Sequence, residues 1–293
     1  MYKLLVTDVD GTLLDSSSRL TELNIRALSD CIAEGINVII ATGKSFDSII
    51  FILEELGLKL PQITLGGAVV ITPERKITNF VKIPVDLYLD VIKQIRQKGH
   101  EPVVATIAGQ IFCQEYTDPM NYIRGIGEKI NKTEDLASEY FRNNAATISI
   151  PINEDDPMDL FIRKTYSGQL QVVRSGNYFF DILNLDASKG NALTGLIKKL
   201  GINKDEVVSF GDSHNDISLF KASGLKIAVK NSYPELLEIA DIIADENNNS
   251  GLGRAIYKHI LKRDLPKNFD NHESSTGTYN ISDIRSTKVS ETY

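Results

Sequence analysis

The feature that most constrains this chain is a pair of carboxylates that directly follows a short apolar segment near the N-terminus. Residues 4–6 are apolar, and the run is short enough to be a buried strand. Asp8 and Asp10 follow this run and lead into Gly11, a residue type that is common in turns. Two charges at the end of a buried strand are costly unless they bind a partner. A cation with a phosphoryl group would be such a partner, so the pair predicts a binding site at a strand end.

The sequence after this pair alternates between amphipathic and apolar stretches. Residues 21–34 carry apolar side chains at helical spacing, and residues 37–41 form the near-continuous apolar run of a strand inside a parallel sheet. Ser45 fits the N-cap of a second helix, and residues 62–65 are predicted as a third strand. Because strands and helices alternate, we predict an α/β fold with a doubly wound, mostly parallel, Rossmann-like sheet that has helices on both faces.

The order of the elements changes after residues 66 and 67. Residues 68–81 are a predicted hairpin, and the strands and helices that follow predict a mostly antiparallel sheet. The first pattern returns at residue 188. We therefore predict a core domain in two parts (residues 1–82 and 185–263), an inserted α/β cap domain (residues 83–184) and a disordered tail (residues 264–293).

Composition and charge argue against several other classes of protein. The chain of 293 residues has a formal net charge of −7 and no basic run, so we expect no nucleic-acid partner. No apolar run reaches membrane-spanning length and the N-terminus has no signal character, so we expect no membrane partner. Cys31 and Cys113 have no metal-site spacing, which predicts buried, reduced thiols and a cytoplasmic location. The sequence predicts no particular oligomeric state.

Polar residues from distant parts of the chain follow the ends of predicted parallel strands. Asp8, Thr42 and Asp212 each come after the last residues of an apolar strand. Ligands in such sheets bind beyond the carboxyl ends of the strands, where the strand order reverses, so these side chains are expected at one crevice. Lys189, at the start of a predicted helix, can reach the same edge.

This set of residues suits phosphoryl transfer. A carboxylate nucleophile, Asp8, would divide the hydrolysis of a phosphate ester into two easier steps through an aspartyl-phosphate. A Mg²⁺ ion between Asp8, Asp212 and a phosphoryl oxygen would neutralise charge. Lys189 would add a cation and the Thr42 hydroxyl a donor. Asp10 would protonate the leaving oxygen and then deprotonate the attacking water.

Four segments resemble the motifs of the haloacid dehalogenase-like (HAD) hydrolase superfamily. They are Asp8-Val9-Asp10-Gly11-Thr12, Ala41-Thr42-Gly43-Lys44, Ser188-Lys189-Gly190 and Gly211-Asp212-Ser213-His214-Asn215-Asp216. The motifs stand in the family's order. The insertion between the second and third is similar to that of the Cof-type phosphatases, which have a large α/β cap. The resemblance covers about residues 3–261.

The resemblance implies a role for each matched residue. Asp8 would be the nucleophile and Asp10 the general acid and base, whose backbone carbonyl also binds the metal. Asp216 would orient Lys189 or the waters of the metal. The implied catalytic set is Asp8, Asp10, Thr42 and Lys189, the substrate-binding set is Thr42, Gly43, Lys44, Lys189 and Asn215, and the metal-binding set is Asp8, Asp10, Asp212 and Asp216.

Two positions depart from the family's pattern. The family usually has Arg at the position of Lys44 and often Asn near Gly66. Lys44 keeps the positive charge but lacks the planar, bidentate group of Arg, and Gly66 lacks a side-chain donor. We expect these departures to lower efficiency and to leave the reaction class unchanged.

Three functions remain as hypotheses. The first is a Mg²⁺-dependent phosphatase that acts on small phosphorylated metabolites, with sugar phosphates as the expected class. The second is a phosphomutase of hexose phosphates, which would use the same core but return the phosphoryl group to the sugar. The third is a non-catalytic protein that binds phosphorylated metabolites, although the intact Asp8, Asp10, Lys189 and Asp212 favour an enzyme.

Overall fold

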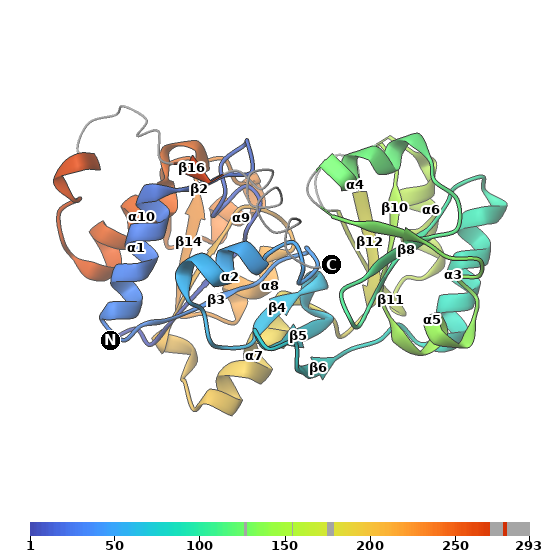
Figure 1. The fold of residues 1–293 in the computed structure, drawn as a ribbon, viewed down its shortest axis with the longest axis horizontal. Helices are drawn as coiled ribbons and strands as arrows, with labels where there is room; N and C mark the ends of the chain where they lie inside the picture. Colours follow the sequence, from blue (N-terminus) through green and yellow to red (C-terminus); the bar gives the residue numbers. More distant parts are fainter. Residues whose placement is uncertain (126–127, 154, 175–178, 270–277, 280–293) are drawn as a thin grey trace, which may run out of the picture. The chain divides into compact units, whose positions relative to one another are not determined.

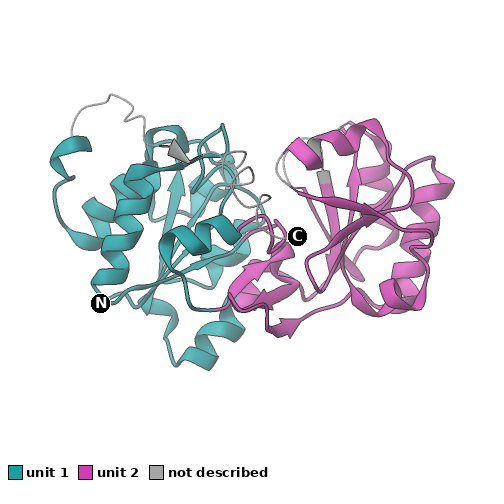
Figure 2. Cartoon of the chain, viewed as in Figure 1, with its two compact units in different colours: residues 1–41, 50–60, 193–293 teal, residues 42–49, 61–192 magenta. Residues whose placement is uncertain are grey.

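The computed structural model describes residues 1–125, 128–153, 155–174, 179–269 and 278–279. The chain divides into two compact units (Figure 2). The first unit is formed by residues 1–41, 50–60 and 193–293, and the second by residues 42–49 and 61–192. The predicted boundaries of the core and cap domains stay a prediction.

A five-stranded parallel sheet is the centre of the first unit (Figure 1). The strand order is β15 (Ile242–Ala244), β14 (Leu225–Val229), β13 (Val207–Gly211), β1 (Leu4–Thr7) and β3 (Asn37–Ile40), and all neighbouring strands are parallel. All residues of β1 and β13 are buried, as their apolar runs predict. The chain runs from β1 to β3 on one side, and later from β13 to β15 on the other. The order therefore reverses at β1 and β13, which confirms the predicted mostly parallel α/β fold.

The helices of the first unit pack against this sheet and against one another. In α1 (Glu22–Ala33), Leu23, Ala27, Leu28 and Cys31 form the buried stripe, and the Thr21 side chain accepts a hydrogen bond from the Asn24 N–H as the N-cap. Helix α1 contacts β3 and α10 (Gly251–Ala255), whereas α8 (Asp216–Lys221) contacts β13 and α9 (Pro234–Ile239) contacts β14. The described residues also form α2 (Ile50–Leu56), α7 (Lys189–Leu200, which begins in the second unit) and a π-helix (Ile256–Leu261), with short 3₁₀ turns at Lys204–Glu206 and Asn247–Asn249.

The second unit contains two sheets. Strands β4 (Gln62–Thr64), β5 (Val69–Ile71) and β6 (Ile77–Phe80) form an antiparallel sheet, which contains the hairpin predicted over residues 68–81. The larger sheet has the order β11 (Leu170–Arg174), β12 (Phe179–Asn184), β10 (Ala145–Pro151), β7 (Val103–Thr106), β8 (Ile111–Cys113) and β9 (Ile130–Lys132), and its pairs are antiparallel except β8 with β9. This mostly antiparallel sheet is the additional sheet that the sequence predicts.

The larger sheet has a hydrophobic core of its own. Helices α3 (Val85–Gln97), α5 (Glu139–Asn144) and α6 (Pro157–Thr165) contribute Tyr88, Phe141 and Ile162 to it. Tyr88 donates a hydrogen bond to the Leu136 carbonyl at 2.6 Å. Burial raises the pKa of Tyr88, so its hydroxyl stays a neutral donor. The 3₁₀ turn Asp118–Met120 and α4 (Asn121–Gly125) complete the described elements of this part.

Two short elements differ from the sequence predictions. Strand β4 pairs with β5 and is not part of the five-stranded parallel sheet. Helix α2 begins at Ile50, so Ser45 is not its N-cap. The Ser45 hydroxyl instead donates a hydrogen bond to Glu128, a tertiary contact that the local sequence does not indicate.

The two cysteines are free and buried, as predicted. Burial, with a smaller contribution from Asp30, raises the pKa of Cys31 to about 12. Among the described residues, no helix combines the length and the apolar character needed to cross a membrane.

The predicted tail lies mostly outside the described residues. Within it, Lys267–Phe269 form a 3₁₀ turn, and β16 (Thr278–Tyr279) pairs antiparallel with β2 (Leu20–Thr21).

Candidate functional site

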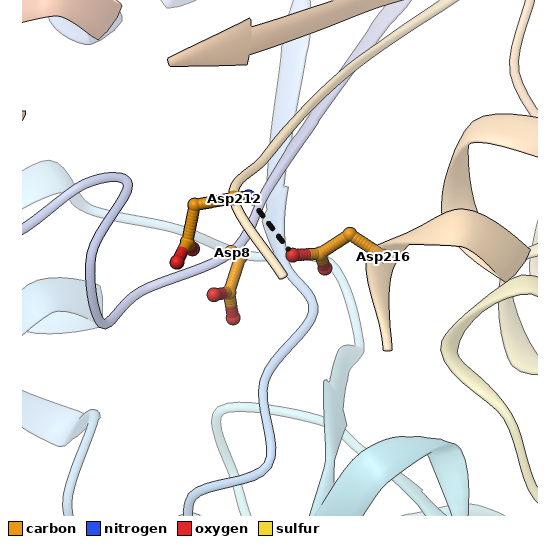
Figure 3. Close-up of side chains that lie close together, drawn as sticks. All are labelled: Asp8, Asp212 and Asp216. Atoms are coloured by element: carbon orange, nitrogen blue, oxygen red, sulfur yellow. Dashed lines mark hydrogen bonds between the residues drawn. The ribbon is translucent and has the colours of Figure 1, made fainter. Parts of the chain in front are cut away.

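Three aspartates come together at the carboxyl end of the parallel sheet. Asp8 directly follows β1, Asp212 directly follows β13, and Asp216 is the first residue of α8. One carboxylate oxygen from each lies within 4.8 Å of the others, and Figure 3 shows the three side chains close together. Asp8 is only 6% exposed and Asp216 is fully buried. The structure thus brings together Asp8 and Asp212, which are far apart in the sequence.

Asp8 lies at the point where the strand order reverses. Its N–H donates to the Phe210 carbonyl at 3.1 Å, so the β1–β13 ladder extends one residue beyond the strand. The Thr7 hydroxyl donates to the Asp8 carbonyl at 2.7 Å. The backbone of Asp8 is therefore fixed on both sides, at the place where ligands of such sheets bind.

Asp216 shapes the loop that carries Asp212. Its Oδ2 accepts hydrogen bonds from the N–H groups of Asp212 and Ser213, both at 3.1 Å (Figure 3 shows the first). A Cβ at Gly211 would lie 2.6 Å from the Asp216 Cβ, so only glycine fits there. Asp216 thus uses one oxygen to hold the loop.

The Asp212 carboxylate contacts the loop after β1. The Thr12 hydroxyl donates to Asp212 Oδ1 at 2.7 Å. Gly11 has a φ of +79°, and a Cβ there would lie 2.5 Å from Asp212 Oδ2. Glycine is therefore required at residue 11 for its backbone conformation and for the space that the carboxylate occupies.

Two asparagines that sequence reasoning missed anchor the loop after β1. Asn231 Nδ2 donates to the Gly11 carbonyl at 2.8 Å, and Asn247 Nδ2 donates to the Leu14 carbonyl at 2.9 Å. The Asn247 N–H donates to Asn231 Oδ1 at 3.0 Å, which joins the two anchors. Each asparagine follows a strand of the same parallel sheet within three residues. Asp8 is selected because residues that follow the carboxyl ends of parallel strands line the ligand site, and the same criterion would have selected these two asparagines.

The three aspartates form an oxygen-rich, negatively charged group. Two unit charges 4 Å apart repel by about 4 kcal/mol at an effective dielectric constant of 20, so such a group favours a cation. Carboxylate oxygens are the ligands that hard divalent cations such as Mg²⁺ prefer. The donor set therefore fits a divalent metal.

Two further predicted residues lie close to this group in the sequence and differ in exposure. Asp10 is exposed, two residues after Asp8. Asn215 is half-buried and its Oδ1 accepts a hydrogen bond from the Ser213 hydroxyl at 2.9 Å. His214, in the same loop, packs its ring against Tyr233 with 4.5 Å between the ring centroids. The loop after β13 thus presents carboxylate, amide and hydroxyl groups beside the acidic group.

Four of the five predicted substrate-binding residues, Thr42, Gly43, Lys44 and Lys189, belong to the second unit. Thr42 follows β3 closely in the sequence, and its backbone pairs with the β4 region. Its N–H donates to the Ile63 carbonyl, and its carbonyl accepts from the Gly66 N–H, both at 3.0 Å. The Thr42 hydroxyl oxygen accepts from the Lys44 N–H at 3.1 Å. Gly43 is half-buried, whereas Thr42 and Lys44 are buried.

A turn with three successive positive φ angles packs against the start of α7. Leu65, Gly66 and Gly67 have φ angles of 49°, 65° and 97°. A Cβ at Gly67 would lie 2.2 Å from the backbone of Ser188, which precedes the buried Lys189. Glycine at residue 67 thus permits this close approach. Asn, which the family often has near Gly66, also tolerates positive φ, so Gly66 keeps the backbone shape and loses the amide donor.

Comparisons with known proteins match this architecture over most of the chain. The family model of the haloacid dehalogenase-like hydrolases matches residues 5–256. Phosphatase YwpJ of Bacillus subtilis is 27% identical over 285 residues, which cover 88% of this chain and 100% of that protein. Phosphoglycolate phosphatase of Methanopyrus kandleri is 26% identical over 268 residues, which cover 90% of this chain and 100% of that protein. The crystal structure of TM0651 from Thermotoga maritima matches with a TM-score of 0.78 at 23% identity, and covers 88% of this chain and 97% of that one.

Proposed function

Because the chain belongs to the haloacid dehalogenase-like hydrolase family and is a phosphatase, we propose that it hydrolyses small phosphorylated metabolites with Mg²⁺ as its cofactor. Sugar phosphates are the proposed substrate class. The observation that carries the proposal is the gathering of Asp8, Asp212 and Asp216 where the strand order reverses. That is the place where a parallel α/β sheet binds its ligand.

Asp8 is the proposed nucleophile. Its buried carboxylate oxygen attacks phosphorus and forms an aspartyl-phosphate, while the ester oxygen leaves and takes a proton from Asp10. Asp10 then takes a proton from water, whose oxygen attacks phosphorus and releases Asp8 and inorganic phosphate. The fixed backbone of Asp8 and the exposed position of Asp10 suit one residue that stays in place and one that exchanges protons with solvent.

The acidic group is the proposed metal site. Asp8, Asp212 and the backbone carbonyl of Asp10 would hold the ion, with Asp216 beside them. A bound Mg²⁺ supplies the positive charge that lets a carboxylate and a phosphate dianion approach each other. Thr12 fixes the Asp212 carboxylate, and Asp216 fixes the backbone of the same loop.

The residues proposed to hold the phosphoryl group are donors and cations. Lys44 and Lys189 are buried cations, and buried positive charge interacts with phosphate more strongly than exposed charge does. Lys189 is also the first residue of α7, where the helix dipole favours an anion. The full proposed set is Thr42, Gly43, Lys44, Lys189 and Asn215.

The test is an assay of inorganic phosphate release from a panel of phosphorylated metabolites in the presence of Mg²⁺. We expect turnover of one or more sugar phosphates, which EDTA abolishes and Mg²⁺ restores. Conversion of a hexose phosphate to its isomer without phosphate release would show the phosphomutase instead. Binding of a sugar phosphate without turnover at saturating Mg²⁺ would show the non-catalytic protein.

The two buried thiols bear on where the protein works. Cys31 and Cys113 are free, which suits a reducing compartment, and we propose a cytoplasmic location on that ground.

A further inference from the structure

The loop of residues 42–49 is tied to a distant part of the second unit through one carboxylate. Glu128 lies between α4 and β9, 83 residues after Ser45. Its Oε1 accepts a hydrogen bond from the Ser45 N–H at 2.9 Å, and its Oε2 accepts one from the Ser45 hydroxyl at 2.5 Å. Both oxygens of Glu128 thus bind the same residue.

This contact is buried. Glu128 is 7% exposed and Ser45 is 1% exposed. The Ser45 and Ser48 hydroxyl oxygens are 3.1 Å apart, so a second buried hydroxyl lies next to the pair. A buried carboxylate is stable only where hydrogen bonds replace its hydration, and charge-assisted bonds of this length are strong. Glu128 and Ser45 therefore keep one fixed arrangement.

The arrangement reaches the predicted phosphate-binding residues through one peptide group. Ser45 directly follows Lys44. The Lys44 carbonyl accepts a hydrogen bond from the Leu65 N–H at 3.0 Å, and the N–H of the same peptide group donates to Glu128. The peptide plane after Lys44 is thus fixed at both ends. The Lys44 N–H in turn donates to the Thr42 hydroxyl oxygen, so the Thr42 hydroxyl is oriented by the same segment of backbone.

We propose that Glu128 is a positioning residue for phosphate binding. It fixes the peptide group between Lys44 and Ser45, and through it the directions of the Lys44 side chain and the Thr42 hydroxyl. Glu128 acts through Ser45 and does not itself touch the substrate. The inference rests on the proposed function, in which Thr42 and Lys44 hold the phosphoryl group.

The test compares two substitutions of Glu128 with a matched control. Glu128→Ala removes both acceptors, and we expect the inhibition constant of inorganic phosphate and the KM of the substrate to rise about tenfold, with a smaller change in kcat. Glu128→Gln keeps one acceptor for the Ser45 N–H and offers an N–H to the Ser45 oxygen. We expect this variant to stay within about threefold of the wild type.

Glu101 provides the control. It is a carboxylate of the same unit that accepts backbone N–H bonds from Gln114 at 2.9 Å and Glu115 at 3.1 Å. Glu101→Ala therefore removes a similar anchor from a different loop. We expect the inhibition constant of inorganic phosphate (the phosphate constant) to stay unchanged in this variant. Thermal unfolding of every variant separates lost binding from lost folding.

A double-mutant cycle with Ser45→Ala tests whether Glu128 affects phosphate binding through Ser45. Ser45→Ala removes the hydroxyl bond to Glu128 and keeps the N–H bond. If both bonds contribute to positioning, the double variant weakens phosphate binding by less than the product of the two single effects. A phosphate constant for Glu128→Ala that matches that of Glu101→Ala would overturn the positioning role alone. A wild-type protein that neither binds nor releases phosphate would overturn the proposed function and the positioning role together.

Discussion

Two loops, one in each unit, carry most of the residues proposed for catalysis and phosphate binding, and their anchors differ in charge. The carboxylate loop (residues 8–14) is held by the neutral amides of Asn231 and Asn247. The phosphate loop (residues 42–49), which contains the buried Lys44, is held by the carboxylate of Glu128. A neutral anchor adds no charge to an acidic group, and an acidic anchor balances a loop that carries a cation. Each anchor thus suits the charge of its loop, and the two loops can be disturbed one at a time.

The largest effect is expected for Asp8→Asn, which removes the proposed nucleophile. We expect kcat to fall by roughly 10⁴-fold or more, because an amide does not form the acyl phosphate. Inorganic phosphate is expected to bind as well as to the wild type or more tightly, since the phosphate loop is intact and one negative charge is gone. Phosphate release assays and calorimetric titration measure the two quantities. Activity near the wild-type level would contradict the role of Asp8 as the nucleophile. A loss of phosphate binding would contradict the claim that the two loops can be disturbed one at a time.

Gly11→Ala tests the carboxylate loop without changing a charged group. The new Cβ would displace the Asp212 carboxylate, 2.5 Å away, so we expect kcat to fall by roughly 10²-fold and the concentration of Mg²⁺ for half-maximal activity to rise. Gly35→Ala is the matched control, because Gly35 has nearly the same φ, +80°, and no atom within 4 Å of the added Cβ. Both variants carry about 1–2 kcal/mol of backbone strain, but only Gly11→Ala is expected to lose activity. Equal activities would show that strain alone matters.

Asn247→Ala removes one amide anchor of the carboxylate loop. The buried Leu14 carbonyl loses its Nδ2 donor, and we expect a loss of about 1–3 kcal/mol in the free energy of unfolding. We also expect kcat to fall roughly tenfold at an unchanged phosphate constant. Steady-state kinetics and urea unfolding provide both readouts, and Asn248→Ala is the control because the Asn248 side chain binds the exposed Ser16 N–H instead. A rise in the phosphate constant would show that the two loops are coupled.

The smallest effect is expected at Cys31, which lies in the same unit as the carboxylate loop but away from it. Burial favours the neutral thiol and raises its pKa from 9.0 to about 12. The contribution of the neutral Cys31 thiol to the free energy of unfolding is therefore fully present below pH 9, and it is lost as the pH rises from 9 towards 12. Between pH 8.5 and 10 we expect the wild type to lose about 1 kcal/mol more unfolding free energy than Cys31→Ala. Parallel curves for the two proteins would contradict this expectation, and both should show the same kcat at pH 8.

The grouping of the proposed reactive residues could be predicted because their signals are local. An apolar run shows where a buried strand ends, and parallel strands place their ends at one edge of a sheet. These two facts suffice to predict that Asp8 and Asp212 lie close together, and in the structure they do. The same reasoning extends to Asn231 and Asn247, but an asparagine in a loop has many other uses, so the signal is weak.

One departure from prediction comes from a tight turn, and the other comes from a contact between distant segments. Strand β4 has the apolar character of a parallel strand, yet the turn at Leu65–Gly67 returns the chain so that β5 pairs with it. Ser45 is a residue type that is common at N-caps, but its hydroxyl donates a hydrogen bond to Glu128, 83 residues later. The pairing of Glu128 with Ser45 has no sequence signal, because nothing near either residue indicates the other.

The strand order also determines when the site can form during synthesis. Strand β1 is translated first, yet one of its two neighbours is β13, and the hydrogen bond between Thr12 and Asp212 spans 200 residues. At the usual 5–20 residues per second, the ribosome needs roughly 10–40 s to make that length of chain. For this time the growing chain carries β1 with one side unpaired, the kind of edge that chaperones protect from aggregation. The acidic group is thus assembled late, after the segment that contains Glu128 has already been made.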